Sequence, residues 1–332
     1  MTMVRMFSRR RAISIFAAVA GLPLLRGAEA AAIPTTWEGQ ALGAPARLLL
    51  NHPDPVAASR LIELVVAEVA RLEKVFSLSR ADSALSELNR VGVLVAPPQD
   101  LISLLHSSRG IWETTGGLFD PTVQPIWRLY YDHFSSNEAA PNGPDKTEIA
   151  RVLAVVGFDR IKFNRDRVVL GSAAGLTFNG IAQGYITDRI VDLLRNAGVT
   201  SCLVDMGEDR AIGSRADGTA WQVGLAESEN DEHPDHVLSI VDKAVATSSS
   251  SGFEFDEAGR FGHIIDPRNG ITPRLYRRVS VVADDATRAD ALATSFCLMP
   301  EGEIRAILEK GADLIVDLIS NEGAHARFGN SA

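Results

Sequence analysis

The chain has 332 residues, of which 46% are hydrophobic and 23% charged, an ordinary globular composition that excludes a disordered, collagenous or multi-span membrane protein. Its 33 Lys and Arg against 42 Asp and Glu give a net charge of −9, which excludes a strong overall attraction for nucleic acid or anionic lipid. Two cysteines, Cys202 and Cys297, are too few for a disulfide scaffold or a thiolate metal site.

The first thirty residues have the layout of an export signal. The arginines at 9–11 precede an apolar stretch over residues 12–25, and the small-x-small sequence at 28–30 suits cleavage by signal peptidase. As a helix this stretch would span about 21 Å, short of the bilayer's hydrocarbon core of about 30 Å, which argues against a membrane anchor. The paired arginines resemble a twin-arginine signal, with the general secretory route as the alternative. We therefore expect residues 1–30 to be removed and the rest to be soluble, periplasmic and without a lipid anchor.

Hydrophobic spacing along the remaining chain predicts helices interspersed with short strands. The clearest helix covers residues 55–76, where apolar side chains recur on one face. Residues 135–146 are polar and rich in turn formers, which predicts an exposed excursion or a boundary. Because the elements do not follow a regular β-α-β order, we expect an α+β fold of mixed sheets with packed helices, forming one compact unit over residues 31–332. The other expected helices are residues 83–90, 99–115, 181–197, 287–298 and 304–310, and the expected strands are residues 46–51, 167–170, 199–206, 221–225, 237–241, 278–283 and 313–319.

Two glycine-bearing segments could bring the backbone close to a ligand. Residues 116–123 (GGLFDPTV) place an aromatic ring and a carboxylate after paired glycines, with a simple helix stop and turn as the alternative. Residues 179–185 (NGIAQGY) lead from a strand-like segment into a helix, where unpaired N–H groups and the helix dipole suit a phosphate, with structural packing as the alternative. The G-x-G-x-x-G pattern is absent there, so a nicotinamide Rossmann site is not supported.

Two further segments could supply a base and a metal site. Residues 263–270 (HIIDPRNG) put an imidazole near a carboxylate, which is equipped to take a proton from a hydroxyl, unless the His is a structural part of the turn. The serines at 248–250 could suggest a catalytic triad with this His, but the G-x-S-x-G elbow of such enzymes is absent. Asp290 and Thr294 are four residues apart on one face of an expected helix, where two hard oxygens could help to hold Mg²⁺ beside phosphates, unless the hydroxyl bonds its own backbone.

Together and in this order, the four segments resemble the bacterial ApbE family of FAD:protein FMN transferases. Those enzymes split FAD at its pyrophosphate and attach FMN through a phosphoester to a Thr or Ser of a target protein. The resemblance also includes residues 75–77, 82–83, Asn89, 205–209 and 221–224, and so covers nearly the whole chain after the export signal. It implies a transferase that uses FAD as its substrate and Mg²⁺ as its metal.

The resemblance also implies a role for each matching residue. His263 would be the base that activates the acceptor hydroxyl. Mg²⁺ would be held by the backbone carbonyl of Gly180 and by the side chains of Asp290 and Thr294. The positions that would line FAD are Leu42, Leu78, Leu118, Phe119, Asp120, Thr177, Gln183 and Ile265.

Residues 176–189 (LTFNGIAQGYITDR) are similar to the NosX branch of the family, which serves nitrous-oxide reductase maturation by flavinylating the membrane protein NosR. The resemblance therefore implies a NosR-like membrane protein as the acceptor. Two other functions stay open. The chain could be an FAD pyrophosphatase that releases FMN and AMP, or a non-catalytic flavin carrier, which Thr177 and Gln183 would favour because the family commonly has charged residues there.

Overall fold

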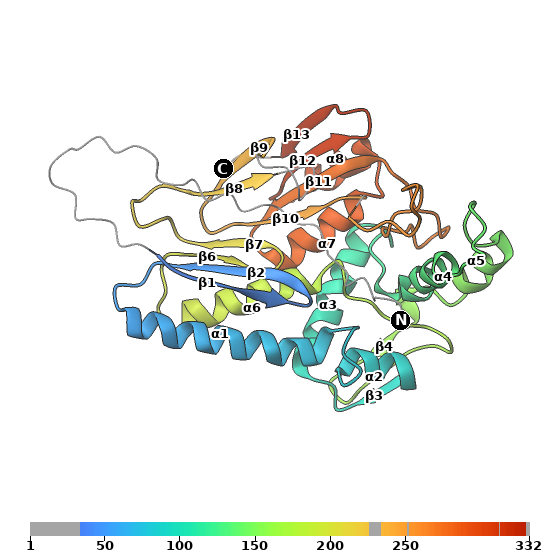
Figure 1. The fold of residues 1–332 in the computed structure, drawn as a ribbon, viewed down its shortest axis with the longest axis horizontal. Helices are drawn as coiled ribbons and strands as arrows, with labels where there is room; N and C mark the ends of the chain where they lie inside the picture. Colours follow the sequence, from blue (N-terminus) through green and yellow to red (C-terminus); the bar gives the residue numbers. More distant parts are fainter. Residues whose placement is uncertain (1–33, 226–233, 251, 312, 330–332) are drawn as a thin grey trace.

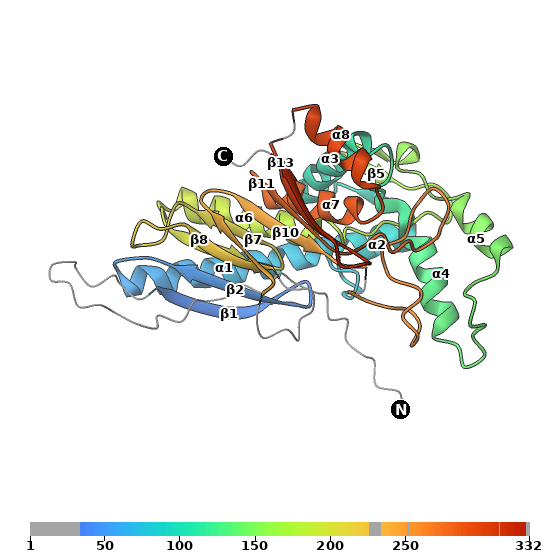
Figure 2. The same ribbon diagram turned by 90° about the horizontal axis from the view of Figure 1, so that it is seen from above.

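The computed structural model describes residues 34–225, 234–250, 252–311 and 313–329, shown as a ribbon in two views in Figures 1 and 2. The expected export signal, residues 1–30, lies outside the described residues. None of the helices within these ranges combines the length and the apolar character needed to cross a bilayer.

An eight-stranded sheet forms the centre of the fold. Its strand order is β1-β2-β6-β7-β10-β11-β12-β13, and each neighbouring pair is antiparallel. A second sheet has the order β3-β5-β4, and β8 pairs with β9. The strands are β1 (Thr35–Ala41), β2 (Ala44–Leu50), β3 (Val93–Val95), β4 (Lys162–Phe163), β5 (Arg167–Val169), β6 (Cys202–Asp205), β7 (Asp209–Ile212), β8 (Trp221–Leu225), β9 (His236–Ile240), β10 (Ala244–Ser248), β11 (Tyr276–Ala283), β12 (Ile315–Ser320) and β13 (His325–Gly329).

Helices cover one face of the large sheet, and the β8–β9 hairpin covers the other (Figure 1). The alternation of side chains along each strand produces both layers: Leu48 and Leu50 face the helices, whereas Leu49 between them packs with β8 and β9. The helices are α1 (Pro55–Phe76), α2 (Ala84–Val91), α3 (Gln99–Thr114), α4 (Gln124–Phe134), α5 (Lys146–Leu153), α6 (Ala182–Asn196), α7 (Ala286–Phe296) and α8 (Glu301–Glu309), with short 3-10 turns η1 (Pro121–Val123) and η2 (Phe158–Arg160).

Helix α1 has the bounds that the apolar spacing predicts. It begins at Pro55 because the Asp54 side chain accepts hydrogen bonds from the N–H groups of Val56 and Ala57, at 2.8 and 3.3 Å, and proline needs no such partner. Its apolar face, which includes Val65 and Leu72, is buried against the sheet and neighbouring helices.

The predicted α+β class is confirmed, but several elements were missed. The excursion expected at residues 135–146 is mostly exposed and links α4 to α5. Neither of those two helices, nor strands β1, β3, β4, β7, β10 and β13, was expected from the sequence. Strands β7 and β10 matter most, because they complete the centre of the large sheet beside helix α7.

Candidate active site

The first turn of α6 lies against α7, and a glycine permits the contact. A Cβ atom at Gly184 would overlap the backbone carbonyl of Ala286 and lie 2.9 Å from Cβ of Asp290. The N–H of Gly184 donates a hydrogen bond to Oδ2 of Asp290 at 3.0 Å, inside the buried contact between the helices. The close approach therefore fixes the Asp290 carboxylate, which is itself buried.

Thr294 lies one turn after Asp290, and its hydroxyl reaches the loop that precedes α6. A Cβ atom at Gly180 would lie 2.8 Å from Oγ1 of Thr294, so only glycine allows this approach without displacement. The Ser248 hydroxyl, at the end of β10, is 3.3 Å from the same Oγ1 atom. The structure thus brings together Gly180, Asp290 and Thr294, the three residues that the family resemblance suggests for a metal.

Glu208 is a buried carboxylate beside Asp290 that the sequence reasoning did not single out. It lies in the turn between β6 and β7, is 6% exposed, and its Oε2 accepts a hydrogen bond from the N–H of Thr247 at 3.2 Å. Burial raises the pKa of the Glu208 carboxyl well above its ordinary value, and the charge of Asp290 raises it further. The only signal in the sequence was that Glu208 lies in the segment 205–209 (DMGED), which belongs to the family resemblance and holds three acidic residues.

Among the described residues, no group of three or more His, Cys, Asp or Glu side chains is arranged to hold a metal ion. A cation near Asp290 would therefore depend on mixed oxygen donors, in which a hydroxyl and a backbone carbonyl supplement the carboxylates. Such hard oxygen donors are the ligands that Mg²⁺ accepts in proteins.

Two segments expected to line FAD are joined directly by a backbone hydrogen bond, from the N–H of Thr177 to the carbonyl of Pro121 at 2.8 Å. Asp120 precedes that proline and is 9% exposed. Its carboxylate accepts hydrogen bonds from the N–H and hydroxyl of Thr122, at 2.8 and 2.5 Å, and from the N–H of Phe158 at 3.0 Å. Burial raises the pKa of Asp120 in spite of these bonds, and the contacts hold the turn in place.

Leu42 and Leu78 meet the same end of helix α1. Leu42 occupies the β1–β2 turn with φ +51°, followed by Gly43 with φ +78°, and its N–H donates to Oε1 of Glu73 in the last turn of α1 at 2.8 Å. Leu78 follows the end of that helix. Both leucines are partly exposed and pack against the main core, so each keeps surface that a ligand could contact.

The remaining four residues expected at FAD are largely covered by protein. Leu118, Phe119, Gln183 and Ile265 are 4%, 6%, 5% and 5% exposed. The Gln183 side chain fills the space beside Gly207, where a Cβ atom would overlap its amide group. Ile265 belongs to a separate cluster with residues of α4. These residues offer little side-chain surface to a ligand.

His263 lies on a hairpin that follows β10 and covers residues 252–263. Its N–H donates to the carbonyl of Phe253 at 3.0 Å, and its Nδ1 lies 3.1 Å from both the N and the O atom of that residue. A Cβ atom at Gly252 would lie 2.8 Å from Cε1 of the ring, so the imidazole is packed against the backbone. The expected neighbouring carboxylate, Asp266, instead accepts hydrogen bonds from Arg268 and organises the following turn.

The hairpin is connected to the Thr294 contact through a short piece of chain. Ser248, whose hydroxyl is 3.3 Å from Oγ1 of Thr294, precedes the first residues of the segment that packs against His263. The chain that follows β10 therefore leads from the Thr294 contact to the segment that packs against His263.

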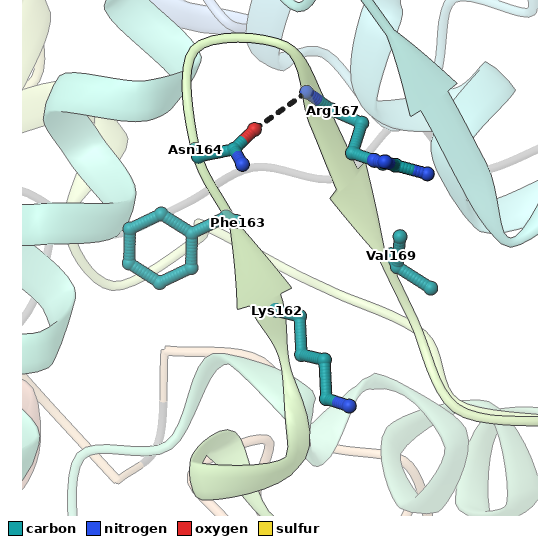
Figure 3. A pocket seen from close by; sticks show the side chains of 5 residues that line it. All are labelled: Lys162, Phe163, Asn164, Arg167 and Val169. Atoms are coloured by element: carbon teal, nitrogen blue, oxygen red, sulfur yellow. Dashed lines mark hydrogen bonds between the residues drawn. The ribbon is translucent and has the colours of Figure 1, made fainter.

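Figure 3 shows a different feature, a pocket of about 310 Å³ beside the β4–β5 hairpin. None of the residues expected to bind FAD or a metal lines it. The candidate active site is therefore defined by the contacts around α6, α7 and the end of β10. The residues that line the pocket are Lys162, Phe163, Asn164, Arg167 and Val169.

A family model described as the ApbE family matches residues 35–316. The chain belongs to the ApbE family. The curated FAD:protein FMN transferase of Treponema pallidum is 30% identical to this ApbE-family protein, over 70% of each chain. A protein of the same description from Klebsiella pneumoniae is 27% identical, over 90% of each chain.

Solved structures share the fold of this ApbE-family protein. The ApbE protein of Thermotoga maritima superposes with a TM-score of 0.76 at 26% identity, covering 89% of this chain and 96% of that chain. The apo form of the Pseudomonas stutzeri flavinyl transferase ApbE gives a TM-score of 0.73 at 24% identity, covering 89% and 95%. The predictions of the ApbE family, of the fold and of a transferase enzyme are confirmed.

Proposed function

We propose that this protein transfers FMN from FAD to a Thr or Ser hydroxyl of an acceptor protein, with release of AMP and with the help of Mg²⁺. The observation that carries the proposal is the meeting of Gly180, Asp290 and Thr294 within an ApbE-family fold. Curated relatives described as FAD:protein FMN transferases support the choice of substrate.

The donor set at this place suits a hard divalent cation. The Gly180 backbone approaches the Thr294 hydroxyl so closely that a side chain would collide with it, and Asp290 supplies a buried carboxylate held by Gly184. Mg²⁺ in proteins commonly uses one or two carboxylates together with substrate phosphates. When bound, it would neutralise charge on the pyrophosphate of FAD.

His263 would take the proton of the acceptor hydroxyl. The hydroxyl oxygen would form a bond to the phosphorus of the FMN half, and the bond from that phosphorus to the bridging oxygen of AMP would break. Nδ1 lies 3.1 Å from both the N and the O atom of Phe253, and in the tautomer that carries its hydrogen on Nδ1, Nε2 would be the ring atom that accepts the proton. The backbone of Phe253 thus fixes the orientation of the imidazole.

We further propose that the protein acts in the periplasm after removal of residues 1–30, and that its acceptor is a NosR-like membrane protein of nitrous-oxide reductase maturation. The arrangement of residues 9–30 and the similarity of residues 176–189 to the NosX branch support this setting. Export of the folded protein by the twin-arginine route would allow flavin to be bound first.

The test is incubation of residues 31–332 with FAD, Mg²⁺ and a peptide that carries an acceptor Thr. A covalent flavin adduct is expected, whereas free FMN would indicate a pyrophosphatase and unchanged FAD a carrier. Asp290→Ala is expected to abolish transfer with the fold intact by circular dichroism, while Asp284→Ala, at an exposed carboxylate that pairs with Lys243, is expected to retain it. Equal turnover of the two variants would refute the metal assignment.

A further inference from the structure

Glu208 is hydrogen-bonded to α6 and to β10, two elements that contact the proposed ligands of the cation. The hydroxyl of Thr187, on α6, donates to the Glu208 backbone carbonyl at 3.0 Å, and the N–H of Thr247, on β10, donates to its Oε2 at 3.2 Å. One contact fixes the backbone of Glu208 and the other fixes its carboxylate. The side chain therefore has a defined position although it lies in a turn between two strands.

The residues that make these two contacts lie close in the chain to residues that contact the proposed metal ligands. Thr187 lies one turn of α6 after Gly184, whose N–H holds the Asp290 carboxylate. Thr247 precedes Ser248, whose hydroxyl is 3.3 Å from Oγ1 of Thr294. Glu208 is thus hydrogen-bonded both to the helix that contacts Asp290 and to the strand that contacts Thr294.

The charge of Glu208 has no cationic partner in the described part of the chain. Arg210, two residues along β7, pairs with Asp188 at 2.6 Å instead. Glu208 is 6% exposed, and the charge of Asp290 acts on it unfavourably. A buried carboxylate next to another one requires compensation, by a proton on one of them or by a cation between them.

We propose that Glu208 supplies a second carboxylate to the divalent cation that Asp290, Thr294 and the Gly180 carbonyl would hold, an inference that rests on the cation site of the proposed function. Two carboxylates balance the two positive charges of the cation, and the hydroxyl and carbonyl add neutral oxygen donors. The cation would then offset the repulsion between the buried carboxylates of Glu208 and Asp290.

The experiment is a calorimetric titration of the metal-free, full-length mature protein with Mn²⁺ and with Mg²⁺. It is carried out without FAD and measures the affinity for the cation. Glu208→Gln keeps the size of the side chain and its ability to accept from Thr247, but removes the charge. We expect its affinity for the cation to fall by roughly 10- to 100-fold. The melting temperature gained on adding the metal is expected to shrink in parallel, because that gain follows the affinity.

The matched control is Asp205→Asn. Asp205 is also buried, and its charge also acts on Glu208, while its Oδ1 accepts from the N–H of Gly207 at 2.8 Å, a bond that an Asn oxygen can keep. If Glu208 acted only through the field of the acidic residues, the two variants would lose affinity alike. A loss confined to Glu208→Gln supports direct binding of the cation.

Wild-type affinity in Glu208→Gln would overturn the inference, because the charge of Glu208 would then add nothing to the binding of the cation. An equal loss in Glu208→Gln and Asp205→Asn would overturn it as well. If Glu208→Gln does not fold, Glu208→Asp decides, since it keeps the charge but withdraws the oxygens, and unchanged affinity there would equally reject direct binding. If the wild type and Asp290→Asn bind the cation equally, the cation site of the proposed function fails, which is a result distinct from a failure at Glu208 alone.

Discussion

The backbone N–H of Gly184 donates to Oδ2 of Asp290 at 3.0 Å, so helix α6 positions a carboxylate that helix α7 carries. The hydrogen bond depends on the absence of a side chain at residue 184, because a Cβ atom there would overlap the carbonyl of Ala286. The contact at Gly184 therefore determines both the packing of the two helices and the position of the Asp290 carboxylate in the proposed cation site.

Gly184→Ala is expected to destabilise the protein by about 1–3 kcal/mol, because the added methyl group forces α6 and α7 apart. Thermal unfolding followed by circular dichroism measures the loss. The matched control is Gly110→Ala in α3, where an added Cβ meets nothing within 4 Å. There alanine is expected to stabilise the helix by about 0.5–1 kcal/mol. A Gly184→Ala protein that melts no lower than the wild type would contradict the close helix contact.

Thr294→Val removes the hydroxyl and nearly preserves the shape of the side chain. Since that hydroxyl faces the Gly180 backbone and Ser248, we expect Mg²⁺ affinity to fall by roughly 10- to 100-fold. Thr294→Ser retains the oxygen and is expected to stay close to wild-type affinity. Calorimetric titration of both variants is the measurement, and a loss in Thr294→Ser as large as that in Thr294→Val would contradict a specific role of the hydroxyl oxygen.

His263→Asn is expected to slow transfer to the acceptor peptide by about 10²- to 10⁴-fold, the usual contribution of a general base. FAD affinity, measured by flavin fluorescence, is expected to be unchanged because the proposed role of His263 concerns the acceptor hydroxyl and not the flavin. His106→Asn, at an exposed position on α3, is the control and is expected to transfer at the wild-type rate. A loss of FAD binding in His263→Asn would instead assign the imidazole to the flavin pocket.

The stability of the metal-free protein is expected to depend on the protonation of Glu208. Its pKa in the native state is raised above the ordinary value of 4.5, so the native state binds this proton more tightly than the unfolded chain does. That contribution to the free energy of unfolding is fully present below pH 4.5 and is lost as the pH rises through the raised native pKa. Urea unfolding at a series of pH values, in the presence of a chelator, measures the decline.

Glu208→Gln has no proton to lose and is expected to show a shallower decline over the same pH range. The comparison isolates one group, because the other titrating residues are shared by both proteins. Identical pH dependence in the variant and the wild type would mean that the Glu208 carboxyl does not change its protonation on unfolding.

Several features of this protein were determined by the sequence alone because they are local. Apolar spacing is enough to define helix α1 over Pro55–Phe76, and strand β8 has the predicted bounds of Trp221–Leu225. The spacing of Asp290 and Thr294 likewise places both side chains on one face of α7, since helical periodicity depends only on neighbours in the chain.

Other features depend on partners that are distant in the sequence, and only the tertiary structure decided them. Strands β7 and β10 are short. β7 pairs with the preceding strand β6 and with the distant β10, and β10 pairs with β7 and with β11, which are both distant from it in the sequence. Glu208 looks like a surface residue in a turn beside other acidic residues, yet it is buried where the charge of Asp290 acts on it. Local patterns report helix faces, but burial and charge proximity arise only when distant segments pack together, and here that packing sets the chemistry of the site.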